Sequence, residues 1–207
     1  MRALLVAGLA AAVATAAQAA PAGITGDTQA YLESAANQSA MKASLEEAAQ
    51  HLVPGCKALS AEGAKTVVYK PISFTPKGEP SAGMFRESAT VEACGTRLRI
   101  NILAIARPDG PIKRITLLPG TTIGDPMLQR DALRYAFGGA QGAVPKDCRA
   151  LGIRNTEFLR YDPKNLEGKK PWREVWTVSA CDKLIPVEMI FQPDADGTTV
   201  IARPHTH

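Results

Sequence analysis

Two glutamates in equivalent positions are the residues of this chain best suited to chemistry. Glu87 lies in the segment Phe85-Arg-Glu-Ser-Ala-Thr-Val-Glu-Ala-Cys94, and Glu174 lies in Trp172-Arg-Glu-Val-Trp-Thr-Val-Ser-Ala-Cys181. In a strand, each carboxylate shares a face with apolar side chains, and apolar surroundings raise the pKa of a carboxyl group. Two such groups about 5–10 Å apart would suit glycoside hydrolysis. We favour the structural alternative, in which each glutamate bonds to an arginine or to backbone amides, because structural ion pairs also perturb pKa values.

Two tryptophans flank the second glutamate. Trp172 and Trp176 are four residues apart, so they point to the same face of a strand. If exposed, they would form a platform for a sugar or a protein, because aromatic side chains dominate binding interfaces. If buried, they are the core of this part of the chain, which is the usual place for large aromatics. We take Trp172, Glu174 and Trp176 as candidate binding residues.

Other residues with catalytic or metal-binding chemistry are few. His205 and His207 alternate at the C-terminus and would make a weak metal site, and His51 lies in a helical stretch where a solvated side chain is expected. The chain has no His-Glu-x-x-His zinc motif and no Gly-x-Ser-x-Gly elbow. We predict no catalytic residue, no metal and no cofactor, which favours a protein that is not an enzyme.

The two glutamate segments are copies of one motif. Both read aromatic, Arg, Glu, two variable positions, Thr, Val, one variable position, Ala, Cys, and the offset of 87 residues holds without a gap from residue 85 to 110. Self-similarity at a fixed offset indicates a tandem duplication. We assign the first copy to residues 20–120 and the second to residues 121–207.

Each copy is predicted to be a helical segment followed by four antiparallel strands, an α+β fold. Period-two alternation of apolar residues and Asp-Gly turns at 109–110 and 196–197 support the strands. The predicted strands are residues 65–74, 85–94, 97–106 and 112–118 in the first copy, and 156–161, 172–181, 184–191 and 198–203 in the second.

The helices are marked by capping residues. In the second copy, Asp125 is a predicted N-cap with Pro126 at the first helical position, and Gly138-Gly139 is predicted to end the helix. In the first copy, a longer helical region runs from Thr28 to about Leu52. Asn37-Gln-Ser is a predicted interruption, because the following Ser44-Leu-Glu-Glu47 reads as a new capping box.

Four cysteines in an exported chain indicate two disulfides, with three possible pairings. Each copy carries one early and one late cysteine, so the duplication selects pairing within copies, Cys56–Cys94 and Cys148–Cys181. Each bridge would tie the exit of a helix to the turn between the second and third strands. For these separations the chain-entropy estimate is about 3.5–4 kcal/mol per bridge.

The N-terminal residues predict export. Arg2 precedes an apolar run over residues 4–17, and Ala17-Gln18-Ala19 is a small-x-small cleavage site, so residues 1–19 read as a signal peptide. The run is too short and too rich in alanine to span a membrane, which needs about 20 strongly apolar residues. No cysteine precedes Cys56, which excludes a lipid-modified cysteine at the cleavage point. We expect a periplasmic or secreted protein.

The net charge of +4 is mild and the basic residues are spread along the chain, whereas nucleic-acid binding normally needs a clustered basic stripe. We therefore expect no nucleic-acid partner.

The order of elements resembles the tandem helix-plus-four-strand units of secreted β-lactamase inhibitor proteins, and more loosely the outer-membrane assembly lipoproteins of similar fold. No residue motif of either family is present, so fold alone implies no function. We expect an exported bacterial-type binding module that is not an enzyme and that recognises a protein or an envelope component. The alternatives are an envelope-polymer hydrolase using Glu174, or a purely structural envelope protein; the oligomeric state is left open.

Overall fold

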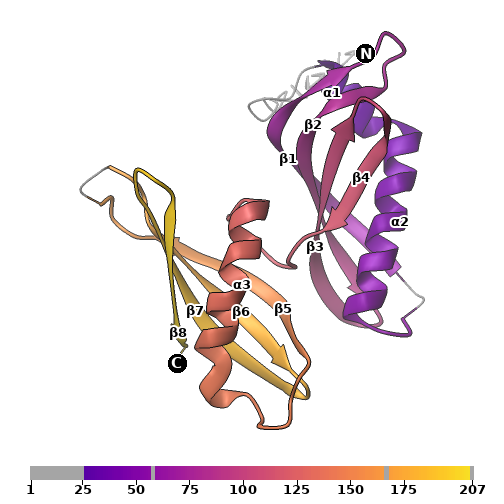
Figure 1. The fold of residues 1–207 in the computed structure, drawn as a ribbon. Coiled ribbons are helices and arrows are strands. Elements are labelled where there is room, and N and C mark those ends of the chain that lie inside the picture. Colours follow the sequence, from indigo (N-terminus) through magenta and orange to yellow (C-terminus); the bar gives the residue numbers. More distant parts are fainter. Residues whose placement is uncertain (1–25, 57–58, 166–167, 206–207) are drawn as a thin grey trace, which may run out of the picture.

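Two α+β units follow one another along the chain, as the duplication predicts (Figure 1). A computed structural model describes residues 26–56, 59–165 and 168–205. The predicted signal peptide lies outside these residues. Within the described ranges, no helix is both long enough and apolar enough to cross a membrane. Each unit places its helical segment before a four-stranded antiparallel sheet, which confirms the predicted fold class.

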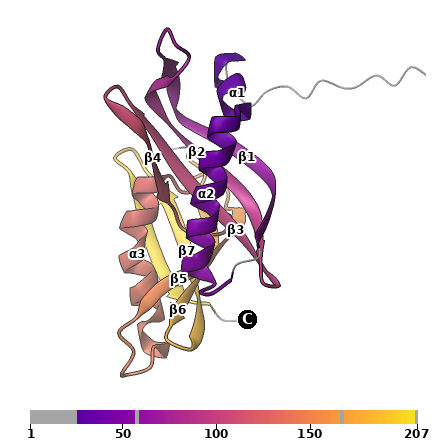
Figure 2. The same cartoon turned by 90° about the vertical axis from the view of Figure 1, so that its right-hand side faces the viewer.

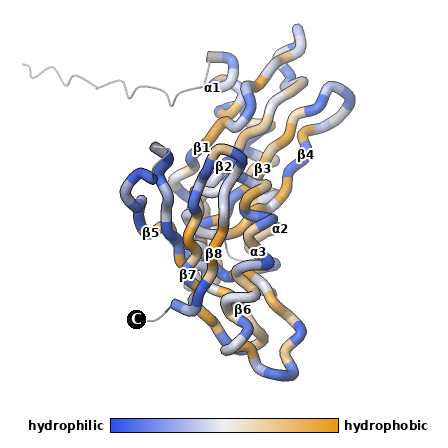
Figure 3. Tube along the Cα trace, turned by 60° about the vertical axis from the view of Figure 1, so that its left-hand side comes forward, coloured by the Kyte–Doolittle hydropathy of each residue, from blue (hydrophilic) through white to orange (hydrophobic). Residues whose placement is uncertain are grey.

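The strands of each sheet lie in sequence order and pair antiparallel throughout. Orange apolar segments run along the strands of both sheets, and blue polar segments gather at the turns (Figure 3). The first strands, β1 and β5, begin earlier than predicted. The first sheet comprises β1 (Leu59–Phe74), β2 (Pro80–Ala93), β3 (Thr96–Arg107) and β4 (Gly110–Thr116). The second comprises β5 (Leu151–Tyr161), β6 (Trp172–Ala180), β7 (Lys183–Pro193) and β8 (Thr198–Pro204).

The helical region of the first unit is interrupted, but not where the sequence predicted. It divides into α1 (Gly26–Glu33) and α2 (Ala35–Leu52) at Ser34, whose hydroxyl accepts a hydrogen bond from the backbone N–H of Asn37 at 3.2 Å. The predicted cap at Ser44 is wrong, because its hydroxyl donates to the carbonyl of Ala40 inside α2. Ser34 was missed as a cap because no Glu or Gln stands three residues after it.

The helix of the second unit, α3 (Pro126–Ala140), begins as predicted at the N-cap Asp125, whose carboxylate accepts from two backbone amides of the first turn. It does not end at Gly138-Gly139 but runs through both glycines into the short 3-10 helix η1 (Gln141–Ala143). A Cβ atom on Gly139 would lie 2.7 Å from the Val187 side chain. This glycine therefore lets α3 approach the sheet closely instead of ending the helix.

Each helix packs toward the later strands of its sheet. Helix α2 contacts β2, β3 and β4, and α3 packs chiefly on β7 and β8. Figure 2, viewed from the side of α2, shows this helix lying across the first sheet. The buried side chains form separate clusters: one between α2 and the first sheet, a smaller one that α1 covers through Tyr31 and Leu32, and one between α3 and the second sheet.

The two disulfides join Cys56 to Cys94 and Cys148 to Cys181, which confirms the pairing within copies. Each late cysteine lies in the turn after the second strand of its unit, at a positive φ of 48° for Cys94 and 52° for Cys181. This left-handed conformation is uncommon for a residue with a side chain. The repeated geometry shows that the duplication extends to the backbone of these turns.

Residues 117–125 connect β4 to α3 and bond to both sheets. On one side, the amides of Leu117 and Gly120 donate to the carbonyls of Asn101 and Arg99 on β3, both at 2.8 Å. On the other side, Gly120 forms a parallel bridge with Thr156 on β5. The linker thus joins β3 of the first sheet to β5, an edge strand of the second. The domain boundary predicted at residues 120–121 falls inside it.

Candidate functional site

Glu174 lies fully buried on β6 and is held by three hydrogen-bond donors. Its Oε1 accepts from the indole N–H of Trp172 at 2.9 Å and from the backbone N–H of Ile123 at 3.1 Å. Its Oε2 accepts from the indole N–H of Trp176 at 2.7 Å, and the residue has 0% exposure. Such bonds are what a buried carboxylate requires, because burying a charge without partners is costly. The cluster ties the linker to the second sheet.

The burial of the two tryptophans differs. Trp176 has no exposed surface and packs against Phe191, with ring centroids 6.1 Å apart. Trp172 stacks on the same phenylalanine at 4.8 Å and is half-buried. The position of Trp176 supports a core role and offers no surface to a ligand. A binding role for Trp172, Glu174 and Trp176 stays a prediction, and of the three only Trp172 has surface with which to touch a partner.

Glu87, the counterpart of Glu174, is contacted by an asparagine and an arginine instead of by tryptophan indoles. Its Oε1 accepts from the side-chain amide of Asn37 on α2 at 2.9 Å, and its Oε2 lies 3.6 Å from a guanidinium nitrogen of Arg114 on β4. Arg114 also donates to Asn37. Burial raises the pKa of Glu87, and the hydrogen bond from Asn37 and the charge of Arg114 oppose this rise. The structural alternative is therefore supported by an ion pair with Arg114 for Glu87 and by a backbone amide for Glu174, although Oε2 of Glu87 accepts no hydrogen bond among the described residues.

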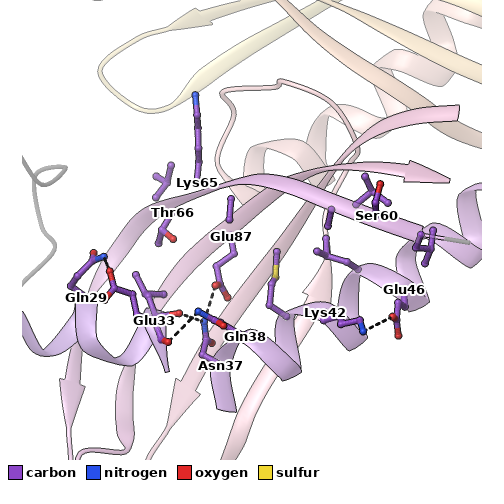
Figure 4. Close-up of a pocket in the computed structure, with 18 residues that line it drawn as sticks. Gln29, Glu33, Asn37, Gln38, Lys42, Glu46, Ser60, Lys65, Thr66 and Glu87 are labelled. Atoms are coloured by element: carbon purple, nitrogen blue, oxygen red, sulfur yellow. Dashed lines mark hydrogen bonds and ion pairs between the residues drawn. The ribbon is translucent and has the colours of Figure 1, made fainter. Parts of the chain in front are cut away.

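A groove of about 960 Å³ lies in the first unit, between the helices and strand β1 (Figure 4). Its floor is mostly apolar and its rim is polar. Glu87 and Asn37 point toward one another and are hydrogen-bonded, and Lys65 turns away from the helix (Figure 4). The groove is lined by Gln29, Leu32, Glu33, Asn37, Gln38, Met41, Lys42, Leu45, Glu46, Leu59, Ser60, Ala61, Ala64, Lys65, Thr66, Val67, Glu87 and Val91.

Two features leave this groove open. Helix α2 packs on β2, β3 and β4, so it leaves the edge strand β1 less covered. In addition, the core under α2 has the small, buried Ala89 at the position that the large Trp176 fills in the second unit. Sequence reasoning did not find the groove. The signal was present in the poorer aromatic content of the first copy, but a small residue is equally compatible with a tighter core.

The histidines form no site in the described chain. His51 is exposed on α2, and the amide of His205 donates to the carbonyl of Pro186 at 3.2 Å. His207 lies outside the described residues. No group of three or more His, Cys, Asp or Glu side chains in residues 26–56, 59–165 and 168–205 is arranged to hold a metal ion.

Comparison with protein-family models, with curated proteins and with solved structures found no match. The resemblance in element order to β-lactamase inhibitor proteins therefore gains no support from these comparisons. Function therefore cannot be inferred from a relative found in these comparisons. The groove and the two glutamate clusters are the features from which it has to be inferred.

Proposed function

We propose that this protein is an exported binding module, without catalytic activity, that recognises a protein of the cell envelope through the groove of its first unit. The observation that carries the proposal is the groove itself, an open space of about 960 Å³ with an apolar floor and a polar rim. A concave apolar surface bordered by polar groups is the common form of a recognition site.

The composition of the rim favours a ligand of low net charge. Glu33 and Glu46 are balanced by Lys42 and Lys65, and Lys42 lies 3.8 Å from Glu46 in an ion pair. Opposite charges that alternate around a recess give no strong field of one sign. An amphipathic surface of a protein fits this mixed rim better than a strongly anionic polymer.

The alternative of an envelope-polymer hydrolase needs a carboxyl group that reaches its substrate. Glu174 has no exposed surface, and both its oxygens already accept hydrogen bonds. The alternative of a purely structural protein agrees with both glutamate clusters, but packing alone gives no reason for the open groove. Binding is thus the function that the geometry supports best.

The test uses the mature chain, residues 20–207, in the cell that produces it. A photo-crosslinking amino acid is placed at Thr66, which lines the groove, and as a control at Glu157, which is exposed on β5. We expect one protein to be linked from position 66 and not from position 157. The same protein, purified, should bind the mature chain in calorimetry. Failure of both positions to yield a protein that binds in the purified system would refute the proposal.

Export is tested on the same material by intact mass. We expect the mass of the chain without residues 1–19 and a further loss of four hydrogens for the two bridges. A full-length mass from the producing cell would refute the exported state.

A further inference from the structure

The second unit shows what occupies the space that is open in the first. The linker runs beside the edge of β5 and bonds to it through the backbone: the amide of Thr156 donates to the carbonyl of Pro119 at 2.9 Å, and the amide of Thr121 donates to the carbonyl of Thr156 at 2.6 Å. The amide of Phe158 adds a bond to the Thr121 hydroxyl at 2.9 Å. An extended segment thus lies parallel to β5 and covers its edge.

The linker also fills the space between α3 and the sheet. Leu118 packs against the core of the second unit, and its amide donates to the side chain of Gln129 on α3 at 3.3 Å. Five residues later, the amide of Ile123 donates to Glu174 on β6. Helix, edge strand and buried glutamate are therefore all contacted by this one extended segment.

The same three features border the groove of the first unit. Glu87 takes the place of Glu174, α2 that of α3, and β1 that of β5. In the second unit, Thr156 of β5 lies opposite Trp176 of β6. In the first unit, Gly63 and Ala64 of β1 lie opposite Ala89, because the neighbouring pairs are Glu62–Thr90 and Lys65–Ser88. Gly63 and Ala64 therefore correspond to Thr156. Among the described residues, no strand other than β2 pairs with β1. Within residues 26–56, 59–165 and 168–205, the edge that the linker covers in the second unit thus has no strand partner in the first.

We propose that the groove takes an extended segment of the partner protein, which adds alongside β1 near Ala64 and places an apolar side chain between α2 and the sheet. This inference rests on the protein-binding function proposed above and names its mode. A free strand edge presents unpaired backbone groups that an extended peptide can satisfy, and pockets for alternate side chains give such binding its specificity. Met41, Leu45 and Val91 provide the apolar floor.

A polypeptide fits this site better than a hydrocarbon chain. The site combines the backbone edge of β1 with the polar side chains of Glu87 and Asn37, and a hydrocarbon would cover these groups without bonding to them. A peptide brings its own donors and acceptors. The linker of the second unit does this, since its amides bond to Thr156 and Glu174.

The first test uses a synthetic peptide with the sequence of residues 117–123, the part of the linker that fills the equivalent space in the second unit. It is titrated into isotope-labelled mature protein while the amide resonances are followed. We expect shifts confined to β1 around residues 60–67 and to the facing side of α2. Changes at the edge of β5 instead would mean that the peptide displaces the linker, and would overturn the proposal, as would no change at millimolar peptide.

A matched pair of variants tests the position. Ala64 is a small, exposed side chain that lines the groove, so Ala64→Trp should obstruct it without disturbing the core. Lys70→Trp puts the same side chain on an exposed position of β1 outside the groove. We expect Ala64→Trp to weaken peptide binding at least tenfold and Lys70→Trp to leave it unchanged. Equal affinities for the two variants would overturn the proposal.

Other occupants give different results. Binding of decanoate with shifts on α2 but none in β1 amides would assign the groove to an acyl chain. Tighter peptide binding after removal of residues 20–25 would assign it to the chain's own first residues. Either result would overturn the inference. If the crosslinked partner binds Ala64→Trp as well as the unaltered chain, the groove inference fails while the protein-binding function stands; if no protein partner binds, the function itself fails.

Discussion

Replacement of Glu174 by glutamine should destabilise the second unit strongly, although the two side chains have nearly the same shape. The carboxylate accepts three hydrogen bonds at full burial. Glutamine keeps one acceptor oxygen and adds an N–H₂ group, so at least one indole N–H loses its acceptor and the new amide hydrogens have none. Each buried unsatisfied group costs about 1–3 kcal/mol. Relief from burying a charge offsets part of this cost, and we expect a loss of about 2–4 kcal/mol in the free energy of unfolding.

Urea unfolding followed by tryptophan fluorescence measures this loss directly. The chain has two tryptophans, and both donate to Glu174, so the emission reports on the second unit alone. Glu157→Gln, on an exposed position of β5, is the control and should stay within about 0.5 kcal/mol of the unaltered protein. A stability of Glu174→Gln within that same range would refute the reasoning, and loss of an activity by such a stable variant would make the glutamate functional.

Three further outcomes follow from the structure. Gly120→Ala should cost at least about 2 kcal/mol in urea unfolding, because φ is +105° and a Cβ would lie 2.0 Å from the Thr156 carbonyl oxygen; an unchanged midpoint would contradict this. Hydrogen bonds from two arginines lower the pKa of Glu188 to about 2, so its stabilisation is present above the unfolded pKa of about 4.3 and lost as pH falls toward 2. Unfolding at several pH values should therefore show Glu188→Gln approaching the unaltered protein below pH 4, and a constant difference would contradict it. Acrylamide should quench part of the emission, from half-buried Trp172, and leave the Trp176 part; complete quenching would contradict the burial.

The candidate site was predicted in part. Parity along the strand placed Trp172, Glu174 and Trp176 on one face, because alternation is a local property of an extended chain. Whether that face meets solvent or a helix depends on residues far away in sequence. In the folded chain α3 and the linker cover Glu174 and Trp176, so the face that looked like a binding platform is chiefly core.

Sequence alone determined the duplication, the cysteine pairing and the order of helix and strands. These properties follow from residue types at fixed spacing, and the internal repeat supplied the comparison that a single copy lacks. Local competition was harder to judge: Ser34 rather than Ser44 caps α2, and α3 continues through Gly138 and Gly139. More than one serine satisfies the local rule for a helix N-cap, and glycine is compatible both with a helix end and with close packing. Tertiary packing selects among these possibilities.

Only the tertiary structure decided which strand edge is covered and which is free. The linker covers β5 because Gly120 permits close approach to Thr156 and because β3 holds the other side of the same segment. The edge of β1 has no such neighbour among the described residues, and the groove lies beside it. These differences arise from contacts between segments distant in sequence. Two copies of one motif therefore come to enclose a filled core in one unit and border an open groove in the other.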